Sequence, residues 1–338
     1  MQLSEIWFLL IAILFIGFMF LEGFDFGVGM GTRFLARDDL ERRTLINSIG
    51  PFWDANEVWL ITAGGAMFAA FPHWYATLFS GYYIPFVILL LALIARGVSF
   101  EFRGRAPHSN WIKTWDWAVF IGSILPPFLV GVLFTSLIKG LPVESDMNMY
   151  LGFTDVVNFY TVVGGITFVL LTYVHGLTFI SLKTTGSLRE RSAEQAKKLY
   201  WWLGSCLAIF IGLTAVYTEA FTEKGAISVA MFTIVAIAFI ALYQFLKTKK
   251  EGFSFASTGI IIIVITAFFF VILFPNVMFS SIDPSNHMTL YEASSGNYSL
   301  KVMTIVAFTL LPVVLAYTIW SYYVFRKRIT GEKEQLKY

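Results

Sequence analysis

Five ionisable side chains lie inside apolar stretches of this 338-residue chain. Glu22 and Asp25 are three residues apart near the end of the first apolar stretch. Asp54 and Glu57 repeat that spacing near the start of the second, and Arg96 lies near the end of the third. On an α-helix this spacing puts both carboxylates of a pair on one face, about 4.5 Å apart along the axis. A charge inside a bilayer costs about 2.5–3.5 kcal/mol, so five at one depth indicate a site that moves protons, ions or electrons.

The four carboxylates of this layer outnumber its single arginine. Asp25 and Asp54 each lie about seven residues from the arginines between the two stretches, which places both roughly 10 Å from one membrane surface. Arg96 is the natural counter-charge for at least one carboxylate. The other carboxylates lie near groups of the same charge and are poorly solvated, and these conditions suit groups that take up and release protons. The alternative is a layer that only neutralises its own charges and fixes the helix register.

The elements that position these residues are predicted to be membrane helices. The chain is 57% hydrophobic and 14% charged, with a mean hydropathy of +0.71, which excludes a soluble protein with a large core. Stretches of about 20 apolar residues cross a bilayer. Nine such spans are predicted, at 6–31, 48–70, 76–102, 114–138, 157–182, 200–221, 226–246, 254–279 and 299–325. The predicted fold class is therefore an all-α polytopic membrane protein.

Basic residues are distributed unequally between the two ends of these spans. Twenty Lys and Arg residues fall in the odd-numbered loops and the C-terminal tail, whereas only Lys139, Lys224 and Lys301 fall in the even-numbered loops. Because cytoplasmic loops carry an excess of Lys and Arg, the N-terminus is predicted outside and the C-terminus in the cytoplasm. The polar layer would then open to the cytoplasm. The basic loops are short and adjoin helix ends, so topology explains them better than nucleic-acid binding does.

Cysteine and histidine are too sparse for most metal or haem chemistry. Cys206 is the single cysteine, which excludes an intrachain disulfide and a cysteine-ligated zinc or iron–sulfur site built by this chain alone. His175 is the one histidine predicted inside a span, whereas His73, His108 and His287 are predicted at or outside helix ends. A bis-histidine haem needs a pair on facing helices. No metal ligands are therefore predicted, and His175 is interpreted as a hydrogen-bonded core residue, with haem ligation as the alternative.

The residues around the acidic pairs indicate what these helices contact. Gly23, Gly27, Gly29 and Gly31 permit close helix approach, so this face of the first span is predicted to pack against protein. Trp53, next to Asp54, is the tryptophan that we single out for packing against a cofactor or a partner. The remaining tryptophans are typical of interfacial aromatic belts.

The chain is predicted to be a single integral membrane subunit over 1–338. Residues 1–138 would form a first four-helix bundle with the polar layer, and 139–299 a second helical half. The polar stretch Arg189–Lys198 is predicted to be a cytoplasmic loop that divides five helices from four, near 183–200. Residues 299–338 would form a ninth helix and a basic cytoplasmic tail.

Several long motifs carry a family resemblance. They are LEGFDFGVGMGTRFL, the run ERRTLINSIGPFWDANEVWLITAGGAMFAAFP, the WDW at Trp115–Trp117, and the late segments SLKVMT and WSYYVFRKR. With these motifs the chain resembles subunit II of cytochrome bd quinol oxidase over essentially its whole length. The short second half is similar to the version found in Gram-positive bacteria.

This resemblance implies a nine-helix subunit of two four-helix bundles plus one peripheral helix in the bacterial plasma membrane. It also implies a pseudo-symmetric heterodimer with subunit I, which holds haems b558, b595 and d. Such a complex oxidises quinol, reduces dioxygen to water and takes protons from the cytoplasm. The resemblance leaves open whether a small single-helix third subunit joins the complex, and it implies contact with membrane lipid but not with nucleic acid.

The resemblance also implies roles for particular residues. The positions matching Asp25, Asp54 and Trp53 lie where subunit II approaches the haem b595/d region, and they are implicated in proton delivery or in holding that site. Asp25 and Asp54 are therefore the first candidates for a proton path. Glu57 and Glu22 come next, with Arg96 adjusting the proton affinity of these carboxylates. A proton-coupled secondary transporter and a purely structural scaffold subunit are the alternative functions.

Overall fold

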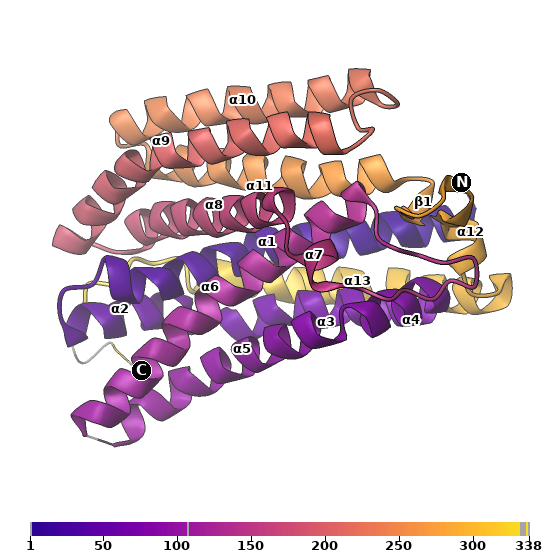
Figure 1. Cartoon of the computed structure of the whole chain (residues 1–338). Helices are drawn as coiled ribbons and strands as arrows, with labels where there is room; N and C mark the ends of the chain where they lie inside the picture. The colour runs from indigo at the N-terminus through magenta and orange to yellow at the C-terminus, as the bar shows by residue number, and fades with distance from the viewer. Residues whose placement is uncertain (1, 107, 332–335, 337–338) are drawn as a thin grey trace.

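Helices make up almost the whole protein, and the long ones run side by side (Figure 1). The computed structural model describes residues 2–106, 108–331 and 336. The long helices are α1 (Leu3–Phe34), α3 (Trp53–Ala70), α5 (Tyr83–Phe102), α6 (Ser109–Lys139), α8 (Phe159–Lys183), α9 (Gly186–Tyr217), α10 (Gly225–Lys247), α11 (Glu251–Leu273) and α13 (Asn297–Val324). The short elements are α2 (Asp39–Ile49), α4 (Pro72–Gly81), α7 (Phe153–Val156), α12 (Leu290–Ala293), two 3-10 turns (Arg103–Arg105 and Pro284–Asn286), and the antiparallel pair β1 (Asn276–Met278) and β2 (Met288–Thr289).

Within the described residues, eight helices are long and apolar enough to cross a membrane. This confirms the prediction of an all-α polytopic membrane protein. The predicted second span falls on α3, which has 18 residues and is not one of the eight. Asp54, Asn56 and Glu57 all lie in its first two turns and lower its hydropathy.

Two of the predicted spans begin before the long helix on which they fall. The span predicted at 48–70 begins in α2, because a turn at Gly50–Phe52 separates α2 from α3. Pro51 lies in that turn, and a proline has no backbone N–H with which to continue the hydrogen bonding of a helix. The span predicted at 76–102 is divided at Tyr82 between α4 and α5.

The prediction of a loop at Arg189–Lys198 is wrong, because the whole stretch is helical and belongs to α9. Leu188, Ser192, Ala196 and Tyr200 recur every four residues and are buried. The charged residues lie between them, so this polar stretch is an amphipathic extension of a membrane helix. The connection between α8 and α9 is only two residues long.

Helix α1 lies in the middle of the bundle, packed against α3, α6, α8 and α11. A Cβ at Gly27 would overlap the backbone of Thr172 and Gly176 on α8, and a Cβ at Gly29 would overlap Ser123 on α6. Close helix approach at these glycines is therefore confirmed. Because α1 is enclosed, the acidic residues on its second half lie in the protein interior.

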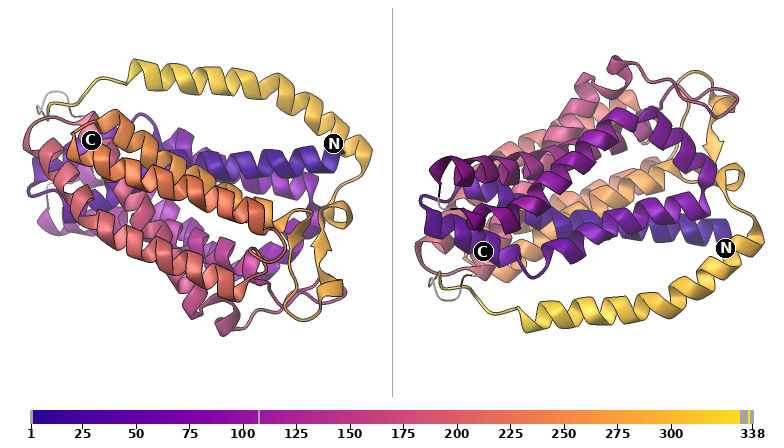
Figure 2. Two further views of the ribbon diagram at one scale, coloured as in Figure 1. Left: turned by 90° about the horizontal axis from the view of Figure 1, so that it is seen from above. Right: turned by 90° about the horizontal axis from the view of Figure 1, so that it is seen from below.

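Helix α13 stands apart along one side of the bundle, and both views in Figure 2 show it (yellow). Leu300 is its one buried residue. Near the N-terminal end of α13, Trp7 Nε1 donates to the Leu300 carbonyl (3.3 Å) and to Thr304 Oγ1 (3.0 Å). Near its C-terminal end, the Tyr322 ring stacks on Phe52 with centroids 4.3 Å apart. The helix is thus attached mainly at its two ends.

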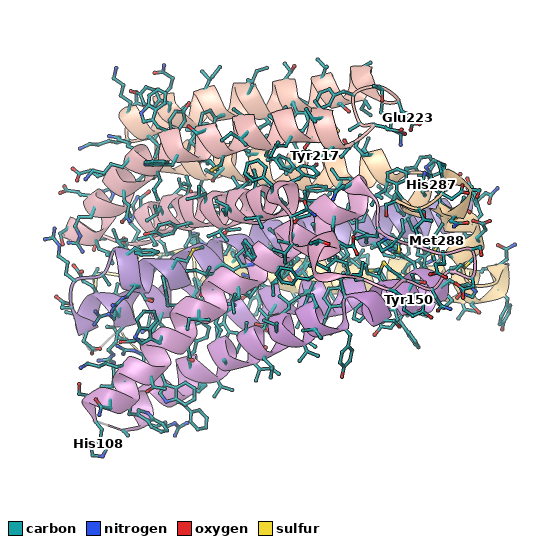
Figure 3. The ribbon with its side chains drawn as sticks, in the orientation of Figure 1. His108, Tyr150, Tyr217, Glu223, His287 and Met288 are labelled. Carbon is teal, nitrogen blue, oxygen red and sulfur yellow. The ribbon has the colours of Figure 1, made fainter. Side chains whose placement is uncertain are left out.

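The end of the bundle that carries the N-terminus is covered by connecting segments. Tyr150, His287 and Met288 lie at this end and His108 at the opposite end (Figure 3). Ser280 Oγ donates to the Val143 carbonyl (2.7 Å), and the Ser280 N–H donates to His287 Nδ1 (3.0 Å). The first bond joins the segment after α6 to the segment after α11, and the second lies within the segment after α11.

Candidate functional site

A buried ionic cluster joins α1, α3 and α5. Glu22 on α1 and Arg96 on α5 have no solvent exposure, and the Arg96 guanidinium forms an ion pair with the Glu22 carboxylate. Glu57 Oε2 on α3 lies 3.8 Å from Arg96 Nη1, and this side chain is 18% exposed. These contacts bring together three of the five residues predicted from sequence, and Asp25 is the fourth member of the cluster.

Aromatic rings and a glycine hold Arg96 in place. Its guanidinium lies over the Phe26 ring (4.9 Å to the centroid) and over the Phe100 ring (5.3 Å). Such cation–π contacts strengthen when the cation is desolvated. A Cβ at Gly122 would lie 2.6 Å from Arg96 Cβ, so the glycine lets α6 close over the arginine. The cluster is thereby sealed from the α6 side.

Asp25 joins the cluster through residues that sequence reasoning missed. Its carboxylate is fully buried and accepts a hydrogen bond from Asn56 Nδ2 on α3 (2.7 Å). The Tyr322 hydroxyl on α13 in turn donates to Asn56 Oδ1 (2.8 Å). The sequence does contain a signal for Asn56, because an amide lies there between the acidic residues Asp54 and Glu57 of an apolar stretch. The sequence carried no comparable signal for Tyr322.

The cluster has more hydrogen-bonding capacity than the described residues satisfy. Glu22 Oε2, Asp25 Oδ1 and Glu57 Oε2 accept no hydrogen bond from them, and Arg96 Nε and Nη2 donate none. Buried polar atoms are nearly always paired with protein or ordered water. Three carboxyl groups beside one guanidinium thus have sites for protons, for water, or for both.

Asp54 lies outside this cluster. Its side chain is exposed, although its predicted depth in the membrane matches that of Asp25. Trp53 packs against α5, with its ring 5.2 Å from the Phe100 centroid and in close contact with Gly97. Asp54 is therefore the member of the polar layer that is open to a neighbour of this chain.

His175 has a hydrogen-bonding partner at each ring nitrogen. Nε2 lies 3.1 Å from the Phe20 carbonyl, which can only accept, so Nε2 carries the proton. Nδ1 lies 2.7 Å from Thr258 Oγ1, and the ring stacks on Phe255 at 4.5 Å. Both nitrogens are thus occupied, and His175 is a core histidine in this structure.

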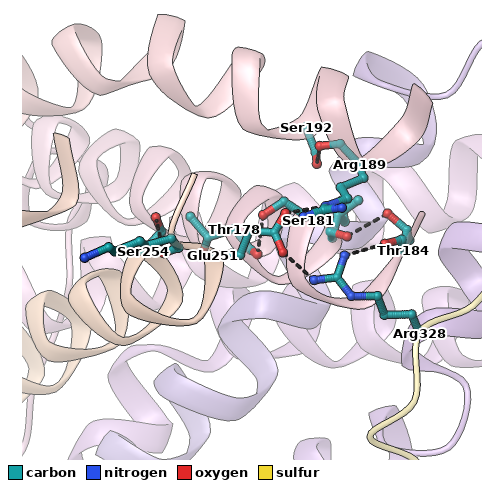
Figure 4. Close-up of polar contacts among 10 residues, drawn as sticks. Thr178, Ser181, Thr184, Arg189, Ser192, Glu251, Ser254 and Arg328 are labelled. Atoms are coloured by element: carbon teal, nitrogen blue, oxygen red, sulfur yellow. Dashed lines mark hydrogen bonds and ion pairs between the residues drawn. The ribbon is translucent and has the colours of Figure 1, made fainter. Parts of the chain in front are cut away.

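Other acidic residues form ion pairs at the end opposite the N-terminus. Arg103 binds Asp116 (2.6 Å) and Asp39 (2.5 Å). Glu251 on α11 binds Arg189 and Arg328 (Figure 4). These pairs join helix ends and lie apart from the buried cluster.

Comparison with known proteins identifies the family. The model of the family described as cytochrome bd terminal oxidase subunit II matches residues 3–325. The chain belongs to the cytochrome bd terminal oxidase subunit II family. It is 52% identical over 337 residues to cytochrome bd ubiquinol oxidase subunit 2 of Bacillus subtilis, covering 100% of this chain and 99% of that protein. It is 36% identical over 366 residues to cytochrome bd-I ubiquinol oxidase subunit 2 of Escherichia coli K12, covering 98% and 96%.

A solved structure supports the fold. The structure of bd oxidase from Geobacillus thermodenitrificans has a TM-score of 0.72 to this chain at 17% identity, covering 97% of this chain and 100% of that chain. As a cytochrome bd subunit II, the chain is a multi-pass membrane component of a respiratory terminal oxidase, which confirms the resemblance found in the sequence. The matches do not favour a secondary transporter or a purely structural scaffold.

Proposed function

We propose that the buried cluster of Glu22, Asp25, Glu57 and Arg96 takes up protons from the cytoplasm and delivers them to the oxygen-reducing site of the oxidase complex. Reducing dioxygen to water with four electrons consumes four protons, and a dry helix bundle needs titratable groups or ordered water to carry them. The observation that carries the proposal is the excess of buried carboxyl groups over guanidinium, with unpartnered oxygens on three of them.

The complex proposed here pairs this chain with subunit I in the bacterial plasma membrane and uses a quinol as electron donor. The haems would belong to subunit I, as b558, b595 and d. Within the described residues, His175 has no free nitrogen, His73 and His108 lie at or beyond helix ends, and His287 Nδ1 already accepts a backbone N–H. This chain therefore does not fit haem ligation. Bound haem would supply electron transfer to dioxygen, and this chain would supply protons.

The geometry suggests an order of transfer. Arg96 holds Glu22 and Glu57 together, and Glu57 is the partly exposed member of that group. Asp54 is three residues before Glu57 on α3 and is exposed. We propose that protons leave the buried carboxyls through Glu57 and Asp54 toward subunit I. Trp53 would pack beside that exit.

The proposed topology counts α3 as a ninth span, with the N-terminus outside and the C-terminus cytoplasmic. The chain ends of nine passes lie on opposite sides, and Figure 2 shows the start of α1 and the end of α13 at opposite ends of the bundle. The basic helix ends around Arg103 and Arg189 lie at the same end of the bundle as the end of α13, which agrees with the cytoplasmic excess of positive charge.

The test is quinol-driven oxygen consumption by the purified complex with subunit I, with the haem absorption spectrum of the same sample. Asp54→Asn and Asp25→Asn should each lower turnover by about 10²-fold, in the range of a lost proton-transfer group, with all haem bands retained. Asp146→Asn, an exposed carboxylate at the other end of the bundle, is the matched control and should leave turnover unchanged. Full activity in both test variants would refute the proposal, and loss of a haem band would replace it with a structural role.

A further inference from the structure

We propose that Tyr322 on α13 is a positioning residue for Asp25, acting through Asn56. The inference rests on the proposed proton-delivery function and extends it to a residue 266 positions away from Asn56 in the sequence. Its basis is a continuous chain of hydrogen bonds from α13 through α3 to α1. The Tyr322 hydroxyl donates to Asn56 Oδ1 (2.8 Å), and Asn56 Nδ2 donates to Asp25 Oδ2 (2.7 Å).

The chain of bonds fixes which way the Asn56 amide points. An amide oxygen only accepts and an amide nitrogen only donates. With Tyr322 donating to Oδ1, the Nδ2 group must face Asp25, where its N–H can hydrogen-bond to a carboxylate. Asn56 Nδ2 also lies 3.4 Å from the Leu21 carbonyl, which favours the same orientation. In this orientation Oδ1 accepts its hydrogen bond from Tyr322, so without the hydroxyl the orientation that presents Nδ2 to the Asp25 carboxylate loses one hydrogen bond.

Contacts at the C-terminal end of α13 hold the Tyr322 side chain in place. Most of the helix is exposed, and the Tyr322 ring lies flat on Phe52, with an interplanar angle of 3°. Beyond the helix, Lys183 Nζ donates to the Phe325 carbonyl, and Ile329 N–H donates to the Lys183 carbonyl (2.9 Å). The end of α13 is thus held against the end of α8.

An ionic cluster on the tail strengthens this attachment (Figure 4). Arg328 donates to Glu251 Oε2 (2.5 Å) and to the Thr184 carbonyl (3.2 Å), and Arg189 binds the other oxygen of Glu251. The tail therefore joins the ends of α8, α9 and α11. These contacts keep Tyr322 within reach of Asn56, although the middle of α13 has few neighbours in this chain.

The titratable and charged groups that face Asp25 come from four helices. In the described residues they are Glu22 on α1, Glu57 on α3, Arg96 on α5 and Tyr322 on α13. Changing Tyr322 to phenylalanine removes the hydroxyl and leaves the first three groups in place. A change in the protonation of Asp25 in that variant can therefore be assigned to the hydroxyl and the amide that it orients.

The test compares Tyr322→Phe with Tyr317→Phe in the complete complex. Tyr317 is on the same helix and is 63% exposed, so it is the matched control. The first readout is the pH at which the infrared C=O absorption of protonated Asp25 appears, assigned by its absence in Asp25→Asn. We expect Tyr322→Phe to move this midpoint to higher pH by about 0.4 to 1, the equivalent of one net hydrogen bond. The second readout is the pH profile of quinol-driven oxygen consumption, which should move in the same direction.

The outcomes separate this inference from the proposed function. An unchanged midpoint and pH profile in Tyr322→Phe, with turnover still lost in Asp25→Asn, would overturn the role of Tyr322 and leave proton delivery intact. Full turnover in both Asp25→Asn and Asp54→Asn would refute proton delivery itself. Equal shifts in Tyr322→Phe and Tyr317→Phe would also overturn the inference, because the effect would then belong to α13 in general.

Discussion

The Arg96 guanidinium of α5 is paired with the Glu22 carboxylate of α1 at a point where neither side chain reaches solvent. A buried pair of this kind is costly to desolvate, and removing one partner leaves an uncompensated charge. The cost of removing Arg96 is higher still, because Glu57 lies 3.8 Å from the same guanidinium nitrogen. Arg96 therefore carries the positive charge on which the acidic cluster depends.

Replacing Arg96 should destabilise the subunit more than any change on the surface. We expect Arg96→Met to lower the stability of the purified complex by about 3–5 kcal/mol, the usual cost of breaking a buried ion pair. Arg96→Lys should cost less, because it keeps the charge but loses the planar fork. Thermal melting of the purified complex measures both.

The control for this prediction is Arg105→Met, since Arg105 is exposed at the end of the same helix pair and should melt within about 0.5 kcal/mol of the unsubstituted protein. The penalty of Arg96→Met should shrink as the pH falls, because carboxyl groups that gain protons no longer need a counter-charge. A penalty that is independent of pH would contradict the assignment of Arg96 as the counter-ion.

The contact between α1 and α8 should tolerate no side chain at Gly27. A methyl group there would overlap the Thr172 carbonyl and the Gly176 backbone, and backbone atoms cannot rotate away. We expect Gly27→Ala to lower stability by about 1–3 kcal/mol, the typical cost of overpacking. Gly212→Ala on α9 has open space and should stabilise or be neutral. Melting curves of the two variants test this, and equal melting temperatures would show that α1 and α8 are less tightly packed than described.

The charged members of the site could be predicted because charges are conspicuous in apolar sequence. Glu22, Asp25 and Arg96 interrupt long hydrophobic stretches, and membrane burial of such groups calls for partners. The rotation of α3 could not be predicted, because the helix is apolar on several sides and no amphipathic pattern fixes its inner face. The equal depths of Asp25 and Asp54 predict that the two acidic pairs face each other, whereas in the structure Asn56 is the α3 residue that contacts Asp25.

The fold, too, could be predicted only in part. Hydropathy indicated the membrane helices, but it could not indicate the polar extension of α9 or the separate helix α2, because both are rich in charge. The contact of Tyr322 with Asn56 depends on how α13 is attached to the bundle. Attachment by a few residues at each end leaves no periodic signal in the sequence.

The proposed topology predicts which residues a membrane-impermeant maleimide can reach. In a Cys206→Ser background, cysteine is placed at Asp146 or at Glu194, which are exposed at opposite ends of the bundle. We expect Asp146→Cys to react in intact cells and Glu194→Cys to react only after the membrane is opened. Labelling followed by mass spectrometry gives the result. The reverse pattern would place the N-terminus in the cytoplasm, and labelling of both in intact cells would rule out an odd number of spans between them.

Replacing His175 should lower stability without changing the haem spectrum. Both ring nitrogens are already hydrogen-bonded within this chain, to the Phe20 carbonyl and to Thr258 Oγ1. We expect His175→Phe to lose about 1 kcal/mol for each bond while the complex retains every haem absorption band. Exposed His108, changed in the same way, should alter neither property and serves as the control. Because a ligand cannot be removed without shifting the band of its iron, the loss or displacement of a haem band in His175→Phe would show that the ring leaves its partners in the assembled oxidase and contacts a haem.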